Sequence, residues 1–569
     1  MGSPETTWGE KHKFQLLLVG IGFFVYFNSL FGAFIWDDIA QIQNNSLIKS
    51  LANLLTLFLG GTYAPQNGLT GTGAYYRPVM SFIFSTIYSL SGAQPFLFHL
   101  TQTTIHITNS IIIFLIFKKF VKEQLALILA IIFLVHPLNV EAVSYISALG
   151  EPLFVFFGLV ALYLFQKKGS LKQATFVGIF LLCSLFAKET GVVFLIVLFA
   201  YYLIVARKQW IPLIVIALTT IPFIFYLFMR FIVARVQIER IPDVPMMTAP
   251  LADRIYTMPA MFWLYIKTFF FPKDIFILQL WSIPGFAKQF YIPLILSMIL
   301  LLGIMSLGIW IWKTNKHNLS AFIFFAIWFL VGVGLHMQLV PLDFTVADRY
   351  FYFAMIGALG LIGISLSSIK RVPLQLEYVG ITCIILIIAI LSLRTIIRNT
   401  NWVNGLSLYG HDLQYKQNDR IQNALAIELI TAGRYSEADK HLQELLVRNP
   451  RESALYANLA GSYEIQGKLK QAKEIYKRGL IVDDSGAIYI NLARMLIQRE
   501  ANFFEARNIS TQGLEKFPKN VDLWIIKVIA EYKLGDKQNA LKDAEKVKEL
   551  LPNSTTEKLY NDILNNQPL

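Results

Sequence analysis

Two adjacent aspartates, Asp37 and Asp38, directly follow the first long apolar stretch of the chain, residues 14–35. A charged side chain is costly to place at the edge of a membrane, so a carboxylate kept there needs a reason. An aspartate in such a position can act as a general base that takes the proton of a hydroxyl group. The alternative is a polar cap that only marks the end of a membrane-spanning helix.

Three cations lie in other polar segments between apolar stretches: Arg77, Lys188 and Arg349. An arginine can bind a phosphate through two parallel hydrogen bonds and a lysine binds it as a point charge, so these side chains are candidate phosphate ligands. Each also has a simpler explanation, since Arg77 can anchor lipid headgroups. Lys188 can pair with the adjacent Glu189. Arg349 can pair with the adjacent Asp348.

Further polar residues lie in the same kinds of segment. The short stretch 136–151 contains His136 and Glu141, and ionisable groups in so short a turn predict a binding pocket, although Glu141 can also cap a helix. Asp343 and Asp348 lie close to the last of the three cations, just before another apolar stretch. On one face of a membrane, these segments would bring carboxylates, a histidine and three cations together.

The composition indicates a membrane protein. The chain has 569 residues, of which 55% are hydrophobic and 15% charged, whereas a soluble domain has about 25% charged residues. The net charge of +13 does not indicate nucleic-acid binding, because many basic residues form short clusters between apolar stretches, as in cytoplasmic membrane loops. Cys183 and Cys383 lie inside apolar stretches and indicate neither a disulfide framework nor a metal site.

The apolar stretches predict about eleven membrane-spanning helices, since each span needs ~20 residues and basic clusters mark the cytoplasmic ends. The clusters are Lys11/Lys13, Lys118/Lys119/Lys122, Lys167/Lys168/Lys172, Arg207/Lys208, Lys313/Lys316 and Lys370/Arg371. The predicted spans are residues 14–35, 96–117, 123–137, 150–166, 174–187, 190–206, 211–229, 291–312, 319–335, 350–367 and 378–396. Residues 255–271 are apolar but punctuated by charges, so we predict a re-entrant or interfacial segment. All the candidate residues, and everything after residue 397, then lie on the extracytoplasmic side.

The C-terminal part of the chain has a soluble composition and an internal repeat of 34 residues. Small or turn-forming residues recur in three series: Ala438, Ala472, Ala506 and Ala540; Gly433, Gly467, Ala501 and Gly535; and Pro450, Asp484, Pro518 and Pro552. This is the period of tetratricopeptide (TPR) repeats, whose groove typically binds a protein or peptide. We predict a membrane domain over 1–397 with a long first loop at 36–95, a linker at 398–417, and about four TPR repeats over 418–569.

Taken in chain order, the polar segments with the candidate residues and the C-terminal repeats resemble those of the transmembrane and TPR-containing protein O-mannosyltransferases of the GT-C superfamily. The resemblance covers nearly the whole chain and rests on Asp37–Asp38, the Tyr-Arg-Pro of Tyr76–Pro78, the His-Pro-x-x-x-Glu-Ala-Val of His136–Val143, the Lys-Glu-x-Gly of Lys188–Gly191 and the acidic-Arg-Tyr-x-Tyr of Asp348–Tyr352. It implies an all-α fold, with a polytopic GT-C helical bundle followed by an α-solenoid of TPR repeats. Two features depart from the family: the repeat array is short, and Asp348 stands where a glutamate is expected.

The resemblance implies transfer of a sugar, expected to be mannose, from a polyprenyl- or dolichyl-phosphate donor to Ser or Thr hydroxyls of proteins on the extracytoplasmic side. The expected partners are this lipid-linked sugar, a protein or peptide acceptor in the TPR groove, and the bilayer, but no nucleic acid. The lack of long loop insertions favours a bacterial plasma-membrane protein with the TPR domain outside. The alternative is the endoplasmic reticulum membrane with the TPR domain in the lumen.

A lipid phosphate is a good leaving group, so the reaction needs a base for the acceptor hydroxyl and cations for the departing phosphate. We assign the base to Asp37, with Asp38 orienting the acceptor or sharing its site, and we expect inversion at the anomeric carbon. The donor phosphate is assigned to Arg77, Arg349 and Lys188, and the sugar or acceptor pocket to His136, Glu141, Tyr76 and Asp348. With two adjacent acids and no clear third ligand, no metal or other cofactor is expected; the alternative, which the resemblance implies for some GT-C members, is a divalent metal near the first-loop carboxylate.

Three other functions fit the sequence less well. A transporter or flippase would carry ionisable residues in mid-span and inverted hydropathy repeats, and we find neither. A non-enzymatic membrane scaffold with TPR repeats would leave the aspartate pair without a role. An oligosaccharide or O-antigen-ligase-like transferase can also combine many spans with TPR repeats, but its large periplasmic loop comes late in the chain. Here the long loop follows the first span.

Overall fold

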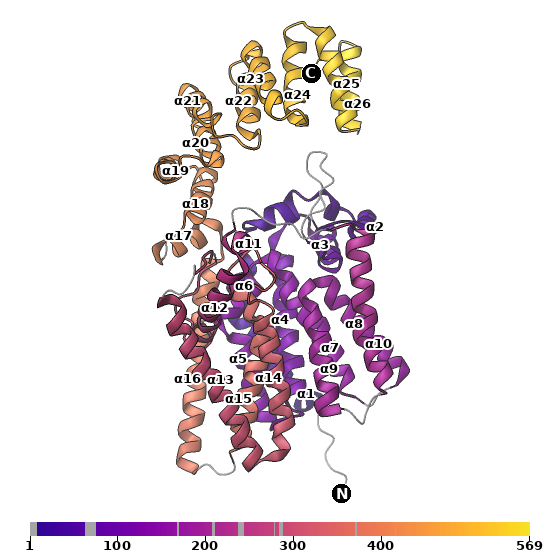
Figure 1. Cartoon of the computed structure of the whole chain (residues 1–569), viewed down its shortest axis with the longest axis vertical. Coiled ribbons are helices and arrows are strands. Elements are labelled where there is room, and N and C mark those ends of the chain that lie inside the picture. The colour runs from indigo at the N-terminus through magenta and orange to yellow at the C-terminus, as the bar shows by residue number, and fades with distance from the viewer. Residues whose placement is uncertain are drawn as a thin grey trace. The chain divides into compact units, whose positions relative to one another are not determined.

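The structure is all-α, as predicted. The computed structural model describes residues 8–62, 75–167, 170–206, 211–236, 244–277, 279–283, 288–369, 373–415, 417–552 and 554–568. Within these ranges the regular structure is helical, apart from a single bridge between Gln279 and Val346. The chain forms two compact units, of which the first ends at Asn404 and the second begins at Gly405 (Figure 1).

Nine helical segments of the described residues are long and apolar enough to cross a membrane. Their helices are α1 (Trp8–Tyr26), α4 (Pro95–Phe117), α7 (Gly150–Phe165), α9 (Val192–Tyr201), α10 (Pro212–Leu227), α13 (Lys288–Thr314), α14 (Lys316–Gly334), α15 (Tyr352–Ser367) and α16 (Leu374–Asn401). The spans predicted at 123–137 and 174–187 are shorter helices. The first is α5 (Glu123–Val135), which bends by 50° into the segment of α6 (Val140–Ser144). The second is α8 (Leu171–Ala187), with 17 residues.

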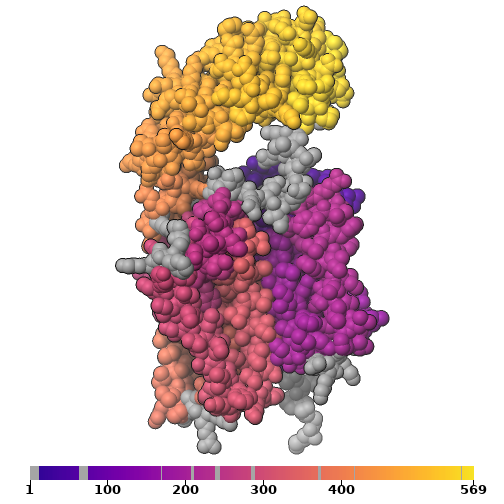
Figure 2. All heavy atoms as spheres, viewed as in Figure 1, coloured from indigo at the N-terminus to yellow at the C-terminus, as the bar shows by residue number. Residues whose placement is uncertain are grey.

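The central and the lipid-facing helices differ in burial. In the segments that contain α7 and α15, 72% and 78% of the residues are buried inside the protein. In those that contain α13 and α16, only 11% are buried. Apolar side chains that the protein does not cover are solvated by lipid tails in a membrane, so α13 and α16 form the periphery of the bundle. The exposed surface of α13 is part of the face shown in Figure 2.

Helix α12 (Leu251–Phe270) falls on the segment predicted to be re-entrant or interfacial, and it is not among the nine span-length segments found in the described ranges. Arg254 on this helix donates hydrogen bonds to the carbonyls of Gln338 and Leu339, both at 2.9 Å. Helices α2 (Leu54–Leu59) and α3 (Pro78–Ser91) lie in the predicted first loop. Residues 63–74 of that loop, and the basic residues Lys11, Lys168, Arg207, Lys208, Lys370 and Arg371 used to orient the spans, lie outside what the structure describes in full.

Side chains from α4 bind backbone carbonyls near the ends of α5 and α6. Backbone that is not helical needs such partners within an apolar environment, where water is absent. His106 Nε2 donates to the carbonyl of Leu134 at 3.0 Å. Gln102 Nε2 donates to the carbonyls of Ala142 and Tyr145, both at 2.7 Å. These polar side chains of α4 therefore support the bent segment after α5, which carries several candidate residues.

The second unit consists of helical hairpins at the predicted period. The pairs are α18 (Asp419–Thr431) with α19 (Tyr435–Arg448), α20 (Ser453–Ile465) with α21 (Leu469–Gly479), α22 (Ala487–Gln498) with α23 (Phe503–Lys516), and α24 (Val521–Lys533) with α25 (Lys537–Leu550), followed by α26 (Ser554–Leu564). The four periodic alanines are fully buried between helices. The periodic turn residues all adopt positive φ angles, 75°, 75° and 83° at the glycines and 49° at Ala501. A glycine at this position avoids the steric cost of that conformation.

The range 398–417, predicted as a linker, is helical over most of its length. Helix α16 continues to Asn401, and α17 (Gly405–Tyr415) follows after three residues. Helix α17 packs against α18, the first helix of the repeats. Trp402, Val403 and Asn404 are the residues between α16 and α17.

Candidate functional site

Asp37 and Asp38 lie in a turn that follows the first span. Trp36 has a φ of 54°, in the left-handed region that bulky side chains rarely adopt. Asp38 fixes this turn, since its Oδ2 accepts a hydrogen bond from the backbone N–H of Ile35 at 3.0 Å. Its Oδ1 accepts hydrogen bonds from the backbone N–H and the hydroxyl of Ser147, at 2.7 and 2.5 Å. Asp38 is 1% exposed, so its contacts are those of a supporting residue.

Asp37 is the more accessible of the two carboxylates. Its Oδ2 accepts a hydrogen bond from the hydroxyl of Tyr145 at 2.8 Å, and its Oδ1 has no hydrogen-bond partner among the described residues. Burial raises the pKa of Asp37, whereas the Tyr145 hydrogen bond and the charges of Arg349 and Arg77 lower it. A carboxylate with one oxygen held and the other open, and with a raised pKa, suits a general base.

Burial also raises the pKa of Asp38, to about 7, although hydrogen bonds from Ser147 and Ile35 lower it. The charge of the neighbouring Asp37 raises the pKa of Asp38 further. Two carboxylates so close together cannot both be ionised without cost, so the titration of one depends on the charge of the other. The structure gives them different tasks: Asp38 holds two loops together, and Asp37 presents an open oxygen.

Arg349 is held by Glu141, which lies in α6. Its Nη1 pairs with Glu141 Oε1, and its backbone N–H donates to Glu141 Oε2 at 3.0 Å. The guanidinium lies over the rings of Phe344 and Tyr350, 4.7 and 5.1 Å from their centroids. Its Nε and Nη2 make no hydrogen bond within the described part of the chain, so Arg349 keeps donors for a phosphate. Arg349 pairs with Glu141 and not with the adjacent Asp348, so the alternative pairing is wrong.

Arg77 and Lys188 are also paired with glutamates. Arg77 makes a two-pronged contact with Glu189, from Nη2 to Oε1 at 2.8 Å and from Nε to Oε2 at 3.2 Å. The Lys188 ammonium contacts the carboxylate of Glu151, at the start of α7. The alternative pairing of Lys188 with Glu189 is therefore wrong. Lys188 follows the end of α8 and Glu189 begins the next helical turn, so these neighbours have different partners.

Asp343 connects the first loop to the segment before α15. The hydroxyl of Tyr75 donates to its Oδ2 at 2.9 Å, and that of Tyr350 donates to its Oδ1 at 3.0 Å. Arg77 lies over the ring of Tyr75 at 4.3 Å, and Lys188 lies over the ring of Tyr350 at 5.4 Å. The three predicted phosphate ligands thus gather around two tyrosines that share one carboxylate. In the sequence, Asp343 lies close to Arg349, but the pattern predicts no role for it.

Two predicted pocket residues are bound to the backbone instead. The Nδ1 of His136 accepts a hydrogen bond from the backbone N–H of Leu138 at 3.2 Å, and its Nε2 donates to the carbonyl of Phe269 at 2.9 Å. Both ring nitrogens are therefore used in holding the bend. The hydroxyl of Tyr76 donates to the carbonyl of Phe58 at 2.8 Å, and its side chain is fully buried. These contacts support the surrounding loops.

Asp348, the last predicted pocket residue, is 4% exposed at the start of the short helix Asp348–Phe351. The contacts that sequence reasoning missed are those of Tyr145 and Ser147 with the aspartate pair. Both lie in the stretch 136–151 that the sequence singled out, but uncharged residues of common types give no signal of their own. In the described ranges, no group of three or more His, Cys, Asp or Glu residues is arranged to hold a metal ion.

Comparison with known proteins connects this geometry to a family. No protein-family model matches the chain. Protein O-mannosyl-transferase TMTC3 of Homo sapiens is 24% identical over 560 residues, which cover 88% of this chain and 60% of that protein. A protein O-mannosyl-transferase of Caenorhabditis elegans is 24% identical over 447 residues, which cover 76% of this chain and 62% of that protein. The chain is related to the protein O-mannosyl-transferases.

A more local match supports the same relationship. Protein O-mannosyl-transferase TMTC1 of Homo sapiens is 29% identical over 192 residues, which cover 31% of this chain. The chain spans about 60% of the length of the relatives that match most of it. The resemblance drawn from the sequence motifs is thus confirmed. Together with the nine span-length helices of the described residues, these relatives identify an integral membrane protein.

The pairing of Arg349 with Glu141 can be tested by a double-mutant cycle. Arg349→Met leaves the buried Glu141 carboxylate unpaired, so we expect a loss of about 3–5 kcal/mol in stability. Adding Glu141→Gln should restore a large part of that loss. The midpoints of thermal unfolding in detergent give the comparison. Lys267→Met, at the exposed pair with Asp274, is the control and should cost less than about 1 kcal/mol. Strictly additive effects of the two buried substitutions would contradict the pairing.

Proposed function

We propose that the protein is a membrane glycosyltransferase that acts on the extracytoplasmic side. It transfers a sugar, which we propose is mannose, from a polyprenyl- or dolichyl-phosphate donor to Ser or Thr hydroxyls of proteins. The observation that carries this proposal is an open carboxylate oxygen on Asp37 close to Arg349, whose charge lowers the pKa of that carboxyl. The names of the related proteins support the reaction class.

The transfer then takes place in one displacement. The acceptor hydroxyl donates a hydrogen bond to Oδ1 of Asp37, which takes the proton as the hydroxyl oxygen attacks the anomeric carbon. The bond from that carbon to the phosphate oxygen breaks, and its electron pair leaves with the lipid phosphate. The open nitrogens of Arg349 stabilise the departing phosphate, and Arg77 and Lys188 add positive charge nearby. Direct displacement inverts the anomeric configuration.

Arg349, Arg77 and Lys188 supply the positive charge that a metal ion supplies in other phosphate-transfer reactions. We therefore propose a reaction without a metal or other cofactor. Each cation is already balanced by a glutamate, and the departing phosphate shares the guanidinium of Arg349 with Glu141 rather than replacing it. We further propose that the protein lies in the plasma membrane of a bacterium with the repeat unit outside. The alternative is the endoplasmic reticulum membrane with the repeats in the lumen.

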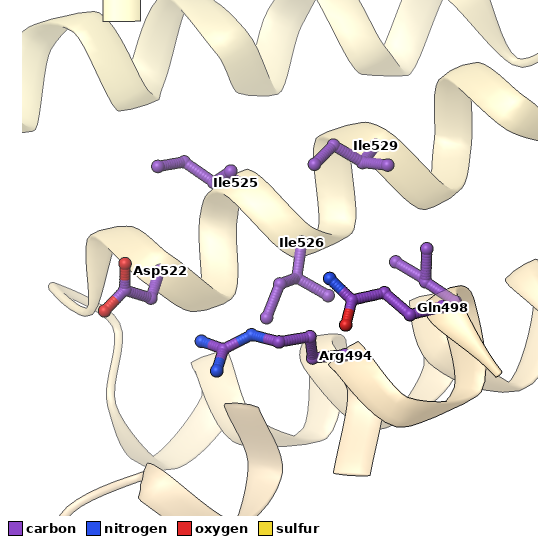
Figure 3. Close-up of a pocket in the computed structure, with 7 residues that line it drawn as sticks. Arg494, Gln498, Asp522, Ile525, Ile526 and Ile529 are labelled. Carbon is purple, nitrogen blue, oxygen red and sulfur yellow. The ribbon is translucent and has the colours of Figure 1, made fainter. Parts of the chain in front are cut away.

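The repeat unit contains a hollow that suits an acceptor polypeptide. Its volume is about 180 Å³, and it is lined by Arg494, Ile497 and Gln498 of α22 and by Asp522, Ile525, Ile526 and Ile529 of α24 (Figure 3). Four isoleucines provide an apolar floor for a side chain, and the polar residues around them can bind a peptide backbone. We propose that the repeats are TPRs that capture the acceptor protein here and raise its effective concentration at the membrane unit.

Asp37→Asn tests the assignment of the base. The amide keeps the size of the side chain but cannot take a proton, so transfer should fall by roughly 10²–10⁴-fold while the protein folds normally. Purified protein is incubated with a panel of polyprenyl-phosphate sugars and a Ser/Thr peptide, and the product is measured by mass spectrometry. Asp343→Asn serves as the matched control, since it removes a nearby charge that makes no such proton transfer, and it should lose less activity. Transfer by Asp37→Asn within roughly threefold of the wild type would exclude Asp37 as the base.

Removal of residues 405–569 tests the division of labour between the two units. The residues proposed for chemistry all lie in the first unit, so transfer to a short Ser/Thr peptide should remain largely intact. Transfer to a full-length protein acceptor should fall by about 10²-fold, because capture by the repeats is lost. Ile525→Lys, which places a charge in the hollow, should show the same selective loss in the complete chain. Equal losses on peptide and protein acceptors would show instead that the repeat unit completes the active site.

A further inference from the structure

The C-terminal end of the last span, α16, is built into the support of the aspartate pair. Asn399 donates hydrogen bonds through Nδ2 to the carbonyl of Val25 and to Oδ1 of Asn28, both at 3.1 Å. Its Oδ1 accepts a hydrogen bond from the hydroxyl of Ser144 at 3.0 Å. One buried amide of α16 thus joins the first span to the bend that carries Tyr145. Residues almost four hundred positions apart in the chain meet at this point.

The residues after α16 contact two neighbours of the aspartate pair, Ala33 and Tyr145. The backbone N–H of Ala33 donates to the carbonyl of Val403 at 2.8 Å, just before the turn that holds the aspartates. The Trp402 side chain is 2% exposed and stacks on the ring of Tyr145, with ring centroids 5.5 Å apart and an interplanar angle of 29°. The hydroxyl of that same tyrosine donates to Asp37 at 2.8 Å.

We propose that Trp402 is a positioning residue for Asp37 and acts through the ring of Tyr145. This inference rests on the proposed role of Asp37 as the base. A tyrosine hydroxyl lies on the axis that runs from Cβ through the ring, so it moves only when the whole side chain swings, and here the indole covers one face of the ring and blocks a swing to that side. Trp402 is in turn packed against Arg398, whose guanidinium lies 5.8 Å from the indole centroid. Replacing the indole by a small side chain leaves a cavity into which the Tyr145 ring can turn.

The consequence is a change in the acidity of Asp37. The groups that act on its carboxylate are the Tyr145 hydroxyl, the cations Arg349 and Arg77, and the neighbouring acids Asp38 and Asp343. The tyrosine hydrogen bond stabilises the ionised form. When the ring turns away, the carboxylate loses this donor and its pKa rises. Trp402 does not touch Asp37, so a shift in that titration is not expected of a residue that merely contributes to packing.

The test follows Asp37 by two independent measurements in the full-length protein. The first is the pH dependence of kcat/KM for sugar transfer. The second is the pH dependence of carbodiimide labelling at Asp37, read by peptide mass spectrometry, which reports the protonated carboxyl without requiring activity. The variants are Tyr145→Phe, Trp402→Leu, the double variant, and Trp402→Phe, which keeps an aromatic ring on Tyr145. Trp312→Leu, on the lipid-facing surface, is the control.

Tyr145→Phe should move both midpoints to higher pH by about one unit, since it removes one hydrogen bond to a charged group. Trp402→Leu should move them in the same direction and lower kcat by about 10-fold to 100-fold. The double variant should shift no further than Tyr145→Phe, and Trp402→Phe should restore most of the wild-type behaviour. If Trp402→Leu does not accumulate, Trp402→Met takes its place with the same expectation.

A labelling midpoint that stays at the wild-type pH in Trp402→Leu, or effects that add in the double variant, would overturn the proposal. The two hypotheses fail differently. Labelling midpoints that shift in a protein that transfers no sugar would support the positioning role and contradict the proposed function. Transfer that depends on Asp37 but shows unshifted labelling in Trp402→Leu would support the proposed function and contradict the positioning role.

Discussion

The site depends on the pairing of each buried cation with a glutamate from another part of the chain: Arg349 with Glu141, Lys188 with Glu151, and Arg77 with Glu189. A charge removed from water is stable only if it is paired, so these contacts decide which loops can lie side by side. They bring the first loop, the bend after α5, the turn after α8 and the segment before α15 to one place. The open donors of one arginine and one open oxygen of Asp37 remain for a ligand.

The same constraint sets the electrostatics of Asp37. Burial raises the pKa of this carboxyl and so favours the protonated form, which cannot act as a base. The Tyr145 hydrogen bond and two arginines oppose that effect, while Asp343 reinforces it. The acidity of Asp37 is thus the balance of several contacts made by residues on separate segments. Asn399 and Trp402 extend this support to α16 and the residue that follows it. The C-terminal end of this span therefore helps to position the turn after the first span.

Much of the fold follows from local patterns. The 34-residue period of Ala438, Ala472, Ala506 and Ala540 predicted the helical hairpins, because small residues recur wherever paired helices pack closely. Apolar length predicted the spans in the same way. The partners within the site could not be predicted, since Lys188 and Glu189 are adjacent in sequence but diverge into different contacts. His136 carried a chemical signal yet binds backbone groups, whereas Tyr145, an uncharged residue, contacts Asp37 directly.

The stereochemistry of transfer tests the central claim most directly. The measurement uses a polyprenyl-phosphate sugar of known anomeric configuration and a Ser/Thr peptide, and determines the configuration of the glycosylated peptide by NMR. Direct displacement assisted by Asp37 predicts a glycopeptide of the opposite configuration, formed with release of the lipid phosphate. A product that retains the configuration of the donor would exclude direct displacement from the opposite face and contradict the account.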